Sequence, residues 1–175
     1  MSLPSTPGVE EGCRPATGDD LDVLVALADL AREELAAAER DGGVWRATSA
    51  RRDPLRPRLA AELTDPLVDV VVGTLDGIAV GYGVAVLADR ADDRPHGVVT
   101  DLFVVDEGRG IGVGAAMLAQ LSDWCAAQGC AGIDALALPG ARETKNFFET
   151  FGFVARAITV HHALPGPTPA SVAPR

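Results

Sequence analysis

The sequence predicts a single α/β domain in which helices flank a mixed, mostly antiparallel central sheet. Two runs rich in β-branched residues lie in the middle of the chain and are joined by a tight turn, and stretches with helical periodicity precede and follow them. The length of 175 residues suits one domain. Because 47% of the residues are hydrophobic and 23% are charged, wholesale disorder and a collagen-like repeat are excluded.

The first part of the domain is expected to hold one short strand and two helical stretches. The strand lies around Cys13, and Thr17-x-x-Asp20 then has the spacing of a capping box before a helix. The apolar stripe of that helix consists of Leu24, Leu27, Ala28 and Ala31. A second helical stretch is expected over Glu33–Ala38, whereas the Gly-, Arg- and Pro-rich segment Asp41–Arg58 gives no clear pattern.

The middle of the chain predicts an antiparallel meander. The runs Val68–Thr74 and Ile78–Val86 flank an Asp-Gly turn, which is a strong hairpin signal. A polar loop over 89–95 follows, and Val98–Val105 is expected to be the third strand of the meander.

Helices and strands alternate in the last part. A helix is expected from about Gly112 to Gln128, followed by a strand over Ile133–Leu138, a short helix over Arg142–Phe151 and a strand over Phe153–Leu164. The domain is expected to span residues 9–164. Loose ends are expected at residues 1–8 and in the proline-rich segment 165–175.

The charge balance limits the classes of partner. The chain has 15 Lys and Arg residues against 25 Asp and Glu residues, a net charge of -10, which disfavours nucleic acid and anionic membranes. No apolar run is long enough to span a membrane, and the N-terminal residues do not resemble a signal peptide, so we expect a cytoplasmic protein. The three cysteines (Cys13, Cys125 and Cys130) and three histidines have no metal-site spacing, and no metal is expected.

A glycine-rich turn between a strand and a helix carries the strongest functional signal. Glycines alternate at 108, 110, 112 and 114 beside Arg109, directly after the expected third strand. Unpaired amides at a helix start favour phosphate, so the turn predicts a ligand that carries a pyrophosphate. A P-loop is excluded because Ala115 and Ala116 replace its Lys-Ser/Thr pair.

A dinucleotide-binding fold stays open as an alternative at this point. Gly110-x-Gly112-x-x-Ala115 satisfies the relaxed fingerprint, and Asp134 follows at about the expected interval for a ribose-binding acid. Against this, Asp134 lies near the start of its strand, an antiparallel meander precedes the motif, and few residues follow it for the rest of a doubly wound sheet.

The same segment resembles a motif of the GNAT superfamily of acyl-CoA-dependent N-acetyltransferases. Arg109-Gly110-Ile111-Gly112-Val113-Gly114 is similar to the Arg/Gln-x-x-Gly-x-Gly/Ala motif of that family. The segment Arg14–Asp20 resembles the family's usual opening, and Phe147–Phe153 resembles its closing helix-to-strand motif. The resemblance covers roughly residues 9–164.

The resemblance implies a site for acetyl-CoA, used as co-substrate. The backbone amides of the motif would hold the CoA pyrophosphate, and the strand backbone before it would pair with the pantetheine arm as an added strand. The last helix would flank the arm on its far side. The implied cofactor-binding residues are Phe103, Val104, Val105, Arg109, Gly110, Ile111, Gly112, Val113, Gly114, Thr144 and Lys145.

Two departures from the family concern a residue that contacts the cofactor and a catalytic residue. Ala141 stands where the family often has an asparagine, and Phe148 replaces the tyrosine that is thought to protonate the departing thiolate. Tyr82, the single tyrosine of the chain, is a weak candidate for that acid, and it also fits a packed sheet position. Asp101 is the candidate base for the amine, although a pair with an arginine explains it equally well. Weaker candidates for the base are His161, His162 and Thr100.

The sequence therefore predicts an N-acetyltransferase that moves an acetyl group from acetyl-CoA directly to a primary amine, without a cysteine intermediate. The acceptor is a small-molecule amine or the lysine or N-terminus of a peptide, and a homodimer stays open. The alternatives are a catalytically weak acyl-CoA-binding module, which Phe148 favours, and the dinucleotide-dependent oxidoreductase. Gly112→Asp is expected to abolish CoA binding and leave the fold intact, because it puts a carboxylate where phosphate belongs.

Overall fold

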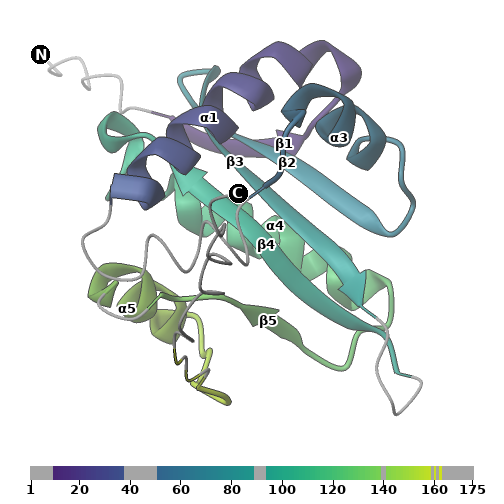
Figure 1. Cartoon of the computed structure of the whole chain (residues 1–175), viewed down its shortest axis with the longest axis vertical. Helices are drawn as coiled ribbons and strands as arrows, with labels where there is room; N and C mark the ends of the chain where they lie inside the picture. The colour runs from purple at the N-terminus through teal and green to yellow at the C-terminus, as the bar shows by residue number, and fades with distance from the viewer. Residues whose placement is uncertain are drawn as a thin grey trace, which may run out of the picture.

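In the computed structural model of the chain, a five-stranded sheet lies between helices on its two faces (Figure 1). The structure describes residues 10–37, 51–88, 94–138, 141–158, 160 and 162. The strands follow one another across the sheet in sequence order: β1 (Glu11–Pro15), β2 (Val68–Leu75), β3 (Ile78–Ala88), β4 (His96–Val104) and β5 (Ile133–Ala135). Neighbours from β1 to β4 are antiparallel, and β5 runs parallel to β4. The predicted fold class is confirmed.

The helices divide between the two faces of the sheet (Figure 1). α1 (Leu21–Ala37) and α3 (Leu55–Glu62) cover one face, and α4 (Val113–Ala127) covers the other, while α5 (Arg142–Thr150) lies beside the β5 edge. Two short 3-10 turns, Gly18–Asp20 and Asp106–Gly108, precede α1 and α4. No helix in the described part of the chain is both long and apolar enough to cross a membrane.

The β2–β3 hairpin forms as its turn residues predict. Asp76 and Gly77 both have positive φ, 49° and 79°, as a two-residue turn with the twist of the flanking strands requires. Alternation along β2 then sends Val70 and Val72 to the α1 face and Val71 to the α4 face. The hairpin therefore supplies apolar side chains to both cores.

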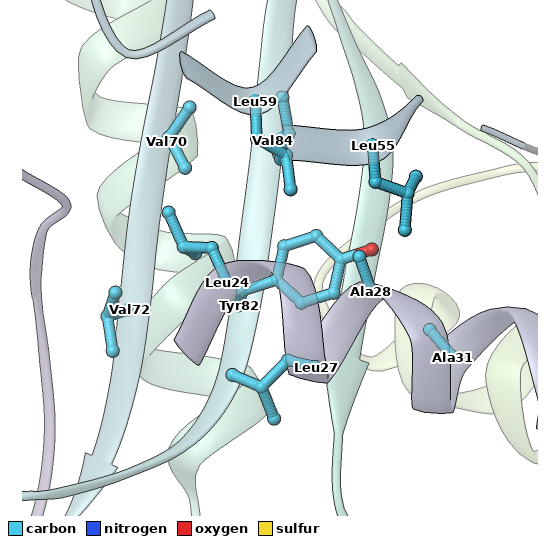
Figure 2. Close-up of a cluster of buried hydrophobic side chains, with 10 residues drawn as sticks. All are labelled: Leu24, Leu27, Ala28, Ala31, Leu55, Leu59, Val70, Val72, Tyr82 and Val84. Carbon is cyan, nitrogen blue, oxygen red and sulfur yellow. The ribbon is translucent and has the colours of Figure 1, made fainter. Parts of the chain in front are cut away.

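Tyr82 lies inside the core between the sheet and α1 (Figure 2). Its ring is 1% exposed and is surrounded by side chains from α1, α3 and β2. The buried members of this cluster are Leu24, Leu27, Ala28, Ala31, Leu55, Leu59, Val70, Val72, Tyr82 and Val84. The predicted apolar stripe of the first helix is confirmed. The second core, under α4, is formed by Val71, Ala85, Val99, Val113, Met117, Leu118, Leu121, Cys125 and Phe148.

Two helix predictions need correction. The stretch Glu33–Ala38 is not a second helix, since α1 runs without a break through Ala37 and no Gly or Pro separates the two stretches. The segment Asp41–Arg58 gave no pattern, yet α3 begins at Leu55 within it, directly after Pro54. Its residues 41–50 lie outside the described residues, as do the predicted ends 1–8 and 165–175.

The predicted strands after α4 are shorter than expected or absent. β5 ends at Ala135 rather than Leu138, and residues 153–158, 160 and 162 of the expected last strand are not in a strand. The apolar side chains that favoured this strand, Val154, Ile158 and Val160, are exposed. A strand requires a neighbour for its amides and carbonyls, and hydrophobic alternation alone does not supply one. The remaining positions of 153–164 lie outside the described residues.

Candidate functional site

The site begins at a bulge in β4. Val84 of β3 pairs with Asp101, but the next residue, Ala85, pairs with Val99, so that Thr100 is the extra residue. β5 pairs with β4 only before the bulge, at positions 97–99. Beyond it the two strands separate, because the bulge bends β4 and β5 ends.

A cavity of about 660 Å³ lies where these strands part. Its walls come from α1, β3, β4, the glycine-rich turn, the segment after β5 and α5. Residues after the bulge, including Asp101 and Phe103, line it on one side, and Leu136 and Leu138 line it on the other. The cavity is thus built from segments that are far apart in the sequence.

The glycine-rich turn closes one end of the cavity. Gly110 and Gly112 have φ of 73° and 100°, which L side chains rarely adopt, and Gly112 is the N-cap of α4. Gly114 lies in the first turn of α4, and together these three glycines line the cavity. The first amides of a helix have no partner within it, so donors for an anion are available here.

The outer edge of β4 offers backbone groups to the cavity. The amide of Val105 donates to the carbonyl of Val80 (2.9 Å), so positions 103 and 105 face β3. By alternation, the backbone groups of Leu102 and Val104 face away from β3, toward the side that β5 has left. Of the three predicted pantetheine-pairing positions, Val104 is therefore the one with its backbone on the open side, and Leu102 is a position that the sequence did not indicate.

Arg109 lies at the cavity, and each of its three guanidinium nitrogens has a partner within the protein. Its Nε donates to the carbonyl of Val104 (2.8 Å), and its Nη2 donates to both carboxylate oxygens of Glu34 in α1 (2.9 and 2.7 Å). Its Nη1 forms an ion pair with Asp106 (2.6 Å). Its Cζ lies 5.7 Å from the centre of the Phe103 ring. The hydrogen bond with Glu34 is the main reason why the pKa of Arg109 is raised.

Asp101, the candidate base, is held by two other cavity residues. Nε and Nη2 of Arg51 donate to its two oxygens (2.8 Å each), and the hydroxyl of Tyr82 donates to Oδ1 (2.9 Å). Nη1 of Arg51 donates in addition to Glu62 of α3 (2.7 Å). The Arg51 and Asp101 side chains are 12% and 14% exposed. The pair with an arginine that the sequence left open is therefore present.

This network fixes the protonation of Tyr82 and Arg51. Burial, and then the negative charge of Asp101, raise the pKa of Tyr82 well above its usual range, so the phenol stays protonated. Burial by itself would lower the pKa of Arg51, but the hydrogen bonds and charges of Asp101 and Glu62 raise it further. A phenol with a raised pKa keeps its proton, so Tyr82 can donate its hydrogen bond to Asp101 but gives up the proton poorly.

α5 forms the far wall. Phe148 lines the cavity and is 7% exposed, with its ring 5.4 Å from that of Phe147 and 5.2 Å from that of Phe153. Thr144 and Ala141 also line the cavity. Lys145 does not, because it points to solvent and pairs with Glu149 one turn later.

Most predicted site residues converge on this cavity. Those that line it are Tyr82, Asp101, Phe103, Val104, Arg109, Gly110, Gly112, Gly114, Thr144 and Phe148. Those that do not line it are Val105, Ile111, Val113 and Lys145. Among the weaker candidates for the base, Thr100 lines the cavity, the exposed His162 does not, and His161 lies outside the described residues.

Sequence reasoning did not identify three of the cavity residues that matter below: Glu34 and Arg51 through their charges, and Leu102 through its backbone groups. Arg51 and Asp101 are 50 positions apart, and no local pattern links them. Glu34 is one of several acidic residues of α1, and no local pattern distinguishes it from the others. In the described ranges, no group of three or more His, Cys, Asp or Glu residues is placed to hold a metal ion.

Solved structures share this fold at low identity. The aminoglycoside N-acetyltransferase AAC(6')-Iy in complex with CoA is 17% identical, with a TM-score of 0.69, and the match covers 93% of this chain and 99% of that one. The tetramutant of the BH1408 protein from Bacillus halodurans is 20% identical, with a TM-score of 0.74, and the match covers 87% of this chain and 99% of that one. An acetyltransferase of Trypanosoma brucei is 18% identical, with a TM-score of 0.62, over 89% and 100%.

The sequence itself gives the family. A search of curated proteins finds no significant match. The family model described as the acetyltransferase (GNAT) family matches residues 26–153, which include most of the sheet, the bulge, the glycine-rich turn and α5. Because this match covers well over half of the chain, and because the resemblance of the motif around Arg109 points the same way, the protein belongs to the GNAT family of acetyltransferases.

Proposed function

We propose that this acyltransferase moves an acetyl group from acetyl-CoA to the primary amine of an acceptor, in one direct step. The observation that carries the proposal is a single cavity that is lined by the glycine-rich turn, by the β4 residues after the bulge, and by the paired side chains of Arg51 and Asp101. A donor that is long and flexible, with a pyrophosphate at a distance from its reactive thioester, fits such a cavity.

The turn residues and β4 supply the donor subsite. The amides at Gly110, Gly112 and Gly114 suit a pyrophosphate because no Cβ restricts its approach and the dipole of α4 favours negative charge. The backbone groups of Leu102 and Val104 suit the amides of a pantetheine arm, which would lie on the β4 edge as an added strand. Phe148 and Thr144 of α5 would flank the arm.

The acceptor nitrogen would attack the thioester carbonyl carbon from the side of Arg51 and Asp101. The ammonium group gives one proton to solvent before its nitrogen can attack. As the C–N bond then forms and the C–S bond breaks, the nitrogen gives a second proton to Asp101 or to solvent, and CoA leaves as a thiolate. Asp101 remains the candidate base, but accepting a proton would weaken its pair with Arg51, so we propose that it first attracts and orients the ammonium group. Tyr82, whose hydroxyl is directed at Asp101, would hold that carboxylate in place.

The thiolate does not need a protein acid. Phe148 has no proton to give, and the raised pKa of Tyr82 makes it a poor donor to a thiolate. A thiol with an ordinary pKa near ~8.5 is a tolerable leaving group at neutral pH, so we propose that solvent protonates it. This step is the least dependent on any single residue.

A covalent cysteine intermediate is disfavoured by the placement of the thiols. None of the three cysteines lines the cavity. Burial, followed by the charge of Asp69, raises the pKa of Cys13 to about 11, and burial with the nearby Cys130 raises the pKa of Cys125 to about 12. The thiols therefore stay protonated, and a protonated thiol is a poor nucleophile.

A small-molecule amine is the acceptor class that we favour. One protein of the same fold is an aminoglycoside N-acetyltransferase, and the proposed acceptor end here has the carboxylate of Asp101 on the cavity surface. A cationic amine would be attracted to such a surface. Peptide amines are the second candidate.

The Gly114 position offers a matched test of the donor subsite. A Cβ at Gly114 would meet the Phe147 ring at 3.5 Å, an ordinary contact, and its φ is not restricted to glycine. Gly114→Asp puts a carboxylate beside the proposed pyrophosphate, and Gly114→Asn is the neutral control of the same shape. We expect calorimetry to give a CoA affinity at least about tenfold lower for the Asp variant than for the Asn variant.

The comparison of these two Gly114 variants tests whether the pyrophosphate binds at the glycine-rich turn. Equal CoA affinity in the two variants would contradict the assignment of the pyrophosphate to this turn. Gly112→Asp, which the sequence suggested, is a poorer test, because φ at this position is 100° and the new Cβ would lie 3.3 Å from the Glu11 side chain. Lost binding there could follow from a distorted turn.

A non-catalytic acyl-CoA-binding module is the second candidate, and Phe148 is the observation that favours it. Release of free CoA thiol from acetyl-CoA across a panel of amines distinguishes the two. Thiol release that depends on an amine supports the transferase, and CoA binding without any release supports the binding module.

A further inference from the structure

Arg109 connects two parts of the site that would otherwise be separate. It belongs to the turn before α4, but it reaches the β4 edge at the Val104 carbonyl and α1 at Glu34. All three nitrogens of its guanidinium have a partner, and two of the partners are carboxylates. The positive charge that the sequence places beside the anion-binding turn is thus neutralised within the protein.

These contacts involve groups that an acyl-CoA would use. In the proposed donor subsite the Val104 carbonyl pairs with the pantetheine arm, yet this carbonyl accepts the Nε–H of Arg109. The guanidinium is also the charged donor nearest in sequence to the glycine amides, so a pyrophosphate there would compete with Glu34 for it.

We propose that Glu34 is a positioning residue that lowers the affinity for acyl-CoA by holding Arg109 across the cavity mouth. Binding of the pyrophosphate would then require Arg109 to exchange its contacts with Glu34 and Val104 for contacts with the phosphate oxygens. This inference rests on the proposed function, because it assumes that CoA is the ligand of the turn.

Glu34, rather than Asp106, carries this role. Asp106 precedes Arg109 by three residues in the same turn, so the two can move together. Glu34 lies 75 positions away on α1, and its two-pronged contact fixes the arginine relative to a different element. The side chains of Glu34 and Arg109 are 51% and 43% exposed, so the contact can open without disrupting the core.

Glu34→Gln tests the inference, with Glu33→Gln as its control. Both changes remove one negative charge from an exposed position of α1, but Glu33 has no contact with Arg109 in the described structure. We expect calorimetry at low salt to give a CoA affinity roughly twofold to fivefold higher for Glu34→Gln than for Glu33→Gln, the range that an exposed ion pair allows. The difference should shrink at high salt, where exposed charges are screened.

An Arg109→Ala background shows whether Glu34 acts through the arginine. In that background the effect of Glu34→Gln should disappear, whereas a general effect of charge on CoA would persist. Equal affinities for Glu34→Gln and Glu33→Gln, a lower affinity for Glu34→Gln, or an effect that survives Arg109→Ala would each overturn the inference. If the unaltered protein does not bind CoA, both the proposed function and this inference are wrong. If it binds CoA and only the effect of Glu34→Gln is missing, this inference alone is wrong.

Discussion

At the scale of single residues, the network around Asp101 in the cavity depends on one arginine. Arg51 holds Asp101 through two hydrogen bonds and Glu62 through a third, and Tyr82 completes the ligation of Asp101. If Asp101 or Glu62 is removed, Arg51 keeps the other carboxylate as a partner. If Arg51 is removed, both carboxylates lose their positively charged partner. The guanidinium is therefore the residue on which the network depends.

Arg51→Met is expected to destabilise the fold by about 3 kcal/mol, the lower end for breaking a buried pair from one side, since Glu62 remains 26% exposed. Tyr82→Phe removes a single hydrogen bond to a charged group and should cost about 1.5 kcal/mol. Urea unfolding measures both. Adding Asp101→Asn to Arg51→Met should recover part of the loss, and a larger loss in the double variant would contradict the network.

At the scale of elements, α5 is a short helix that depends on its docking. Nine residues are too few for a stable isolated helix, so its position relies on tertiary contacts. Phe148 is its buried residue, and it joins the core under α4 while also lining the cavity. The Phe148 side chain therefore both anchors α5 to the core and forms part of the cavity wall.

Phe148→Ala should therefore affect both stability and binding. We expect a loss of about 3 kcal/mol in unfolding free energy, typical of a truncated buried phenylalanine, together with faster hydrogen exchange in α5 and weaker CoA binding. Phe151→Ala, at a position that is 44% exposed in the same region, is the control and should cost less than about 1 kcal/mol. Similar losses in the two variants would indicate that Phe148 does not anchor the helix.

At the scale of the whole molecule, the folded state depends on a charge pair that ties β1 to the start of α1. Arg14 donates to both oxygens of Asp20 (2.7 and 2.6 Å), and the Thr17 amide donates to the same carboxylate (2.8 Å), the contact that the capping-box spacing predicts. The Arg14 hydrogen bond is the main reason why the pKa of Asp20 lies well below its usual value near 3.8.

Acid should therefore weaken the fold through Asp20. Because its pKa is lower in the folded than in the unfolded chain, its contribution is present above about pH 4 and is lost as the pH falls below the unfolded pKa toward the folded one. We expect Asp20→Asn to cost about 2 kcal/mol at pH 6, in the range for hydrogen bonds to a charged group, and progressively less between pH 4 and pH 2.5. A difference between the two proteins that does not change with pH would contradict the assignment.

Local patterns sufficed for much of the fold. The Asp-Gly turn, the alternation in β2 and the apolar stripe of α1 each involve neighbours in sequence, and each forms as predicted. The last strand was mispredicted because its alternation is local, whereas the pairing that a strand requires is not. α3 was missed because its eight residues include a proline and few apolar positions.

The same division holds for the candidate site. The glycine-rich turn was found because its glycines alternate within seven consecutive residues and their spacing itself has a physical meaning. Arg51 and Glu34 could not be found, because each acts on a partner 50 or more positions away and an exposed-looking arginine or glutamate has no distinguishing local signal.

By itself, the amino-acid sequence determined the fold class, the hairpin, the apolar stripe of α1, the glycine-rich turn and the family, since these depend on periodicity and on residues close together in the chain. Tertiary structure alone decided where β4 and β5 part, that Asp101 is bound to Arg51, and that Arg109 is held by Glu34. Those features depend on strand register and on contacts between long side chains of different elements. Neither the register nor these contacts can be predicted from the local sequence pattern.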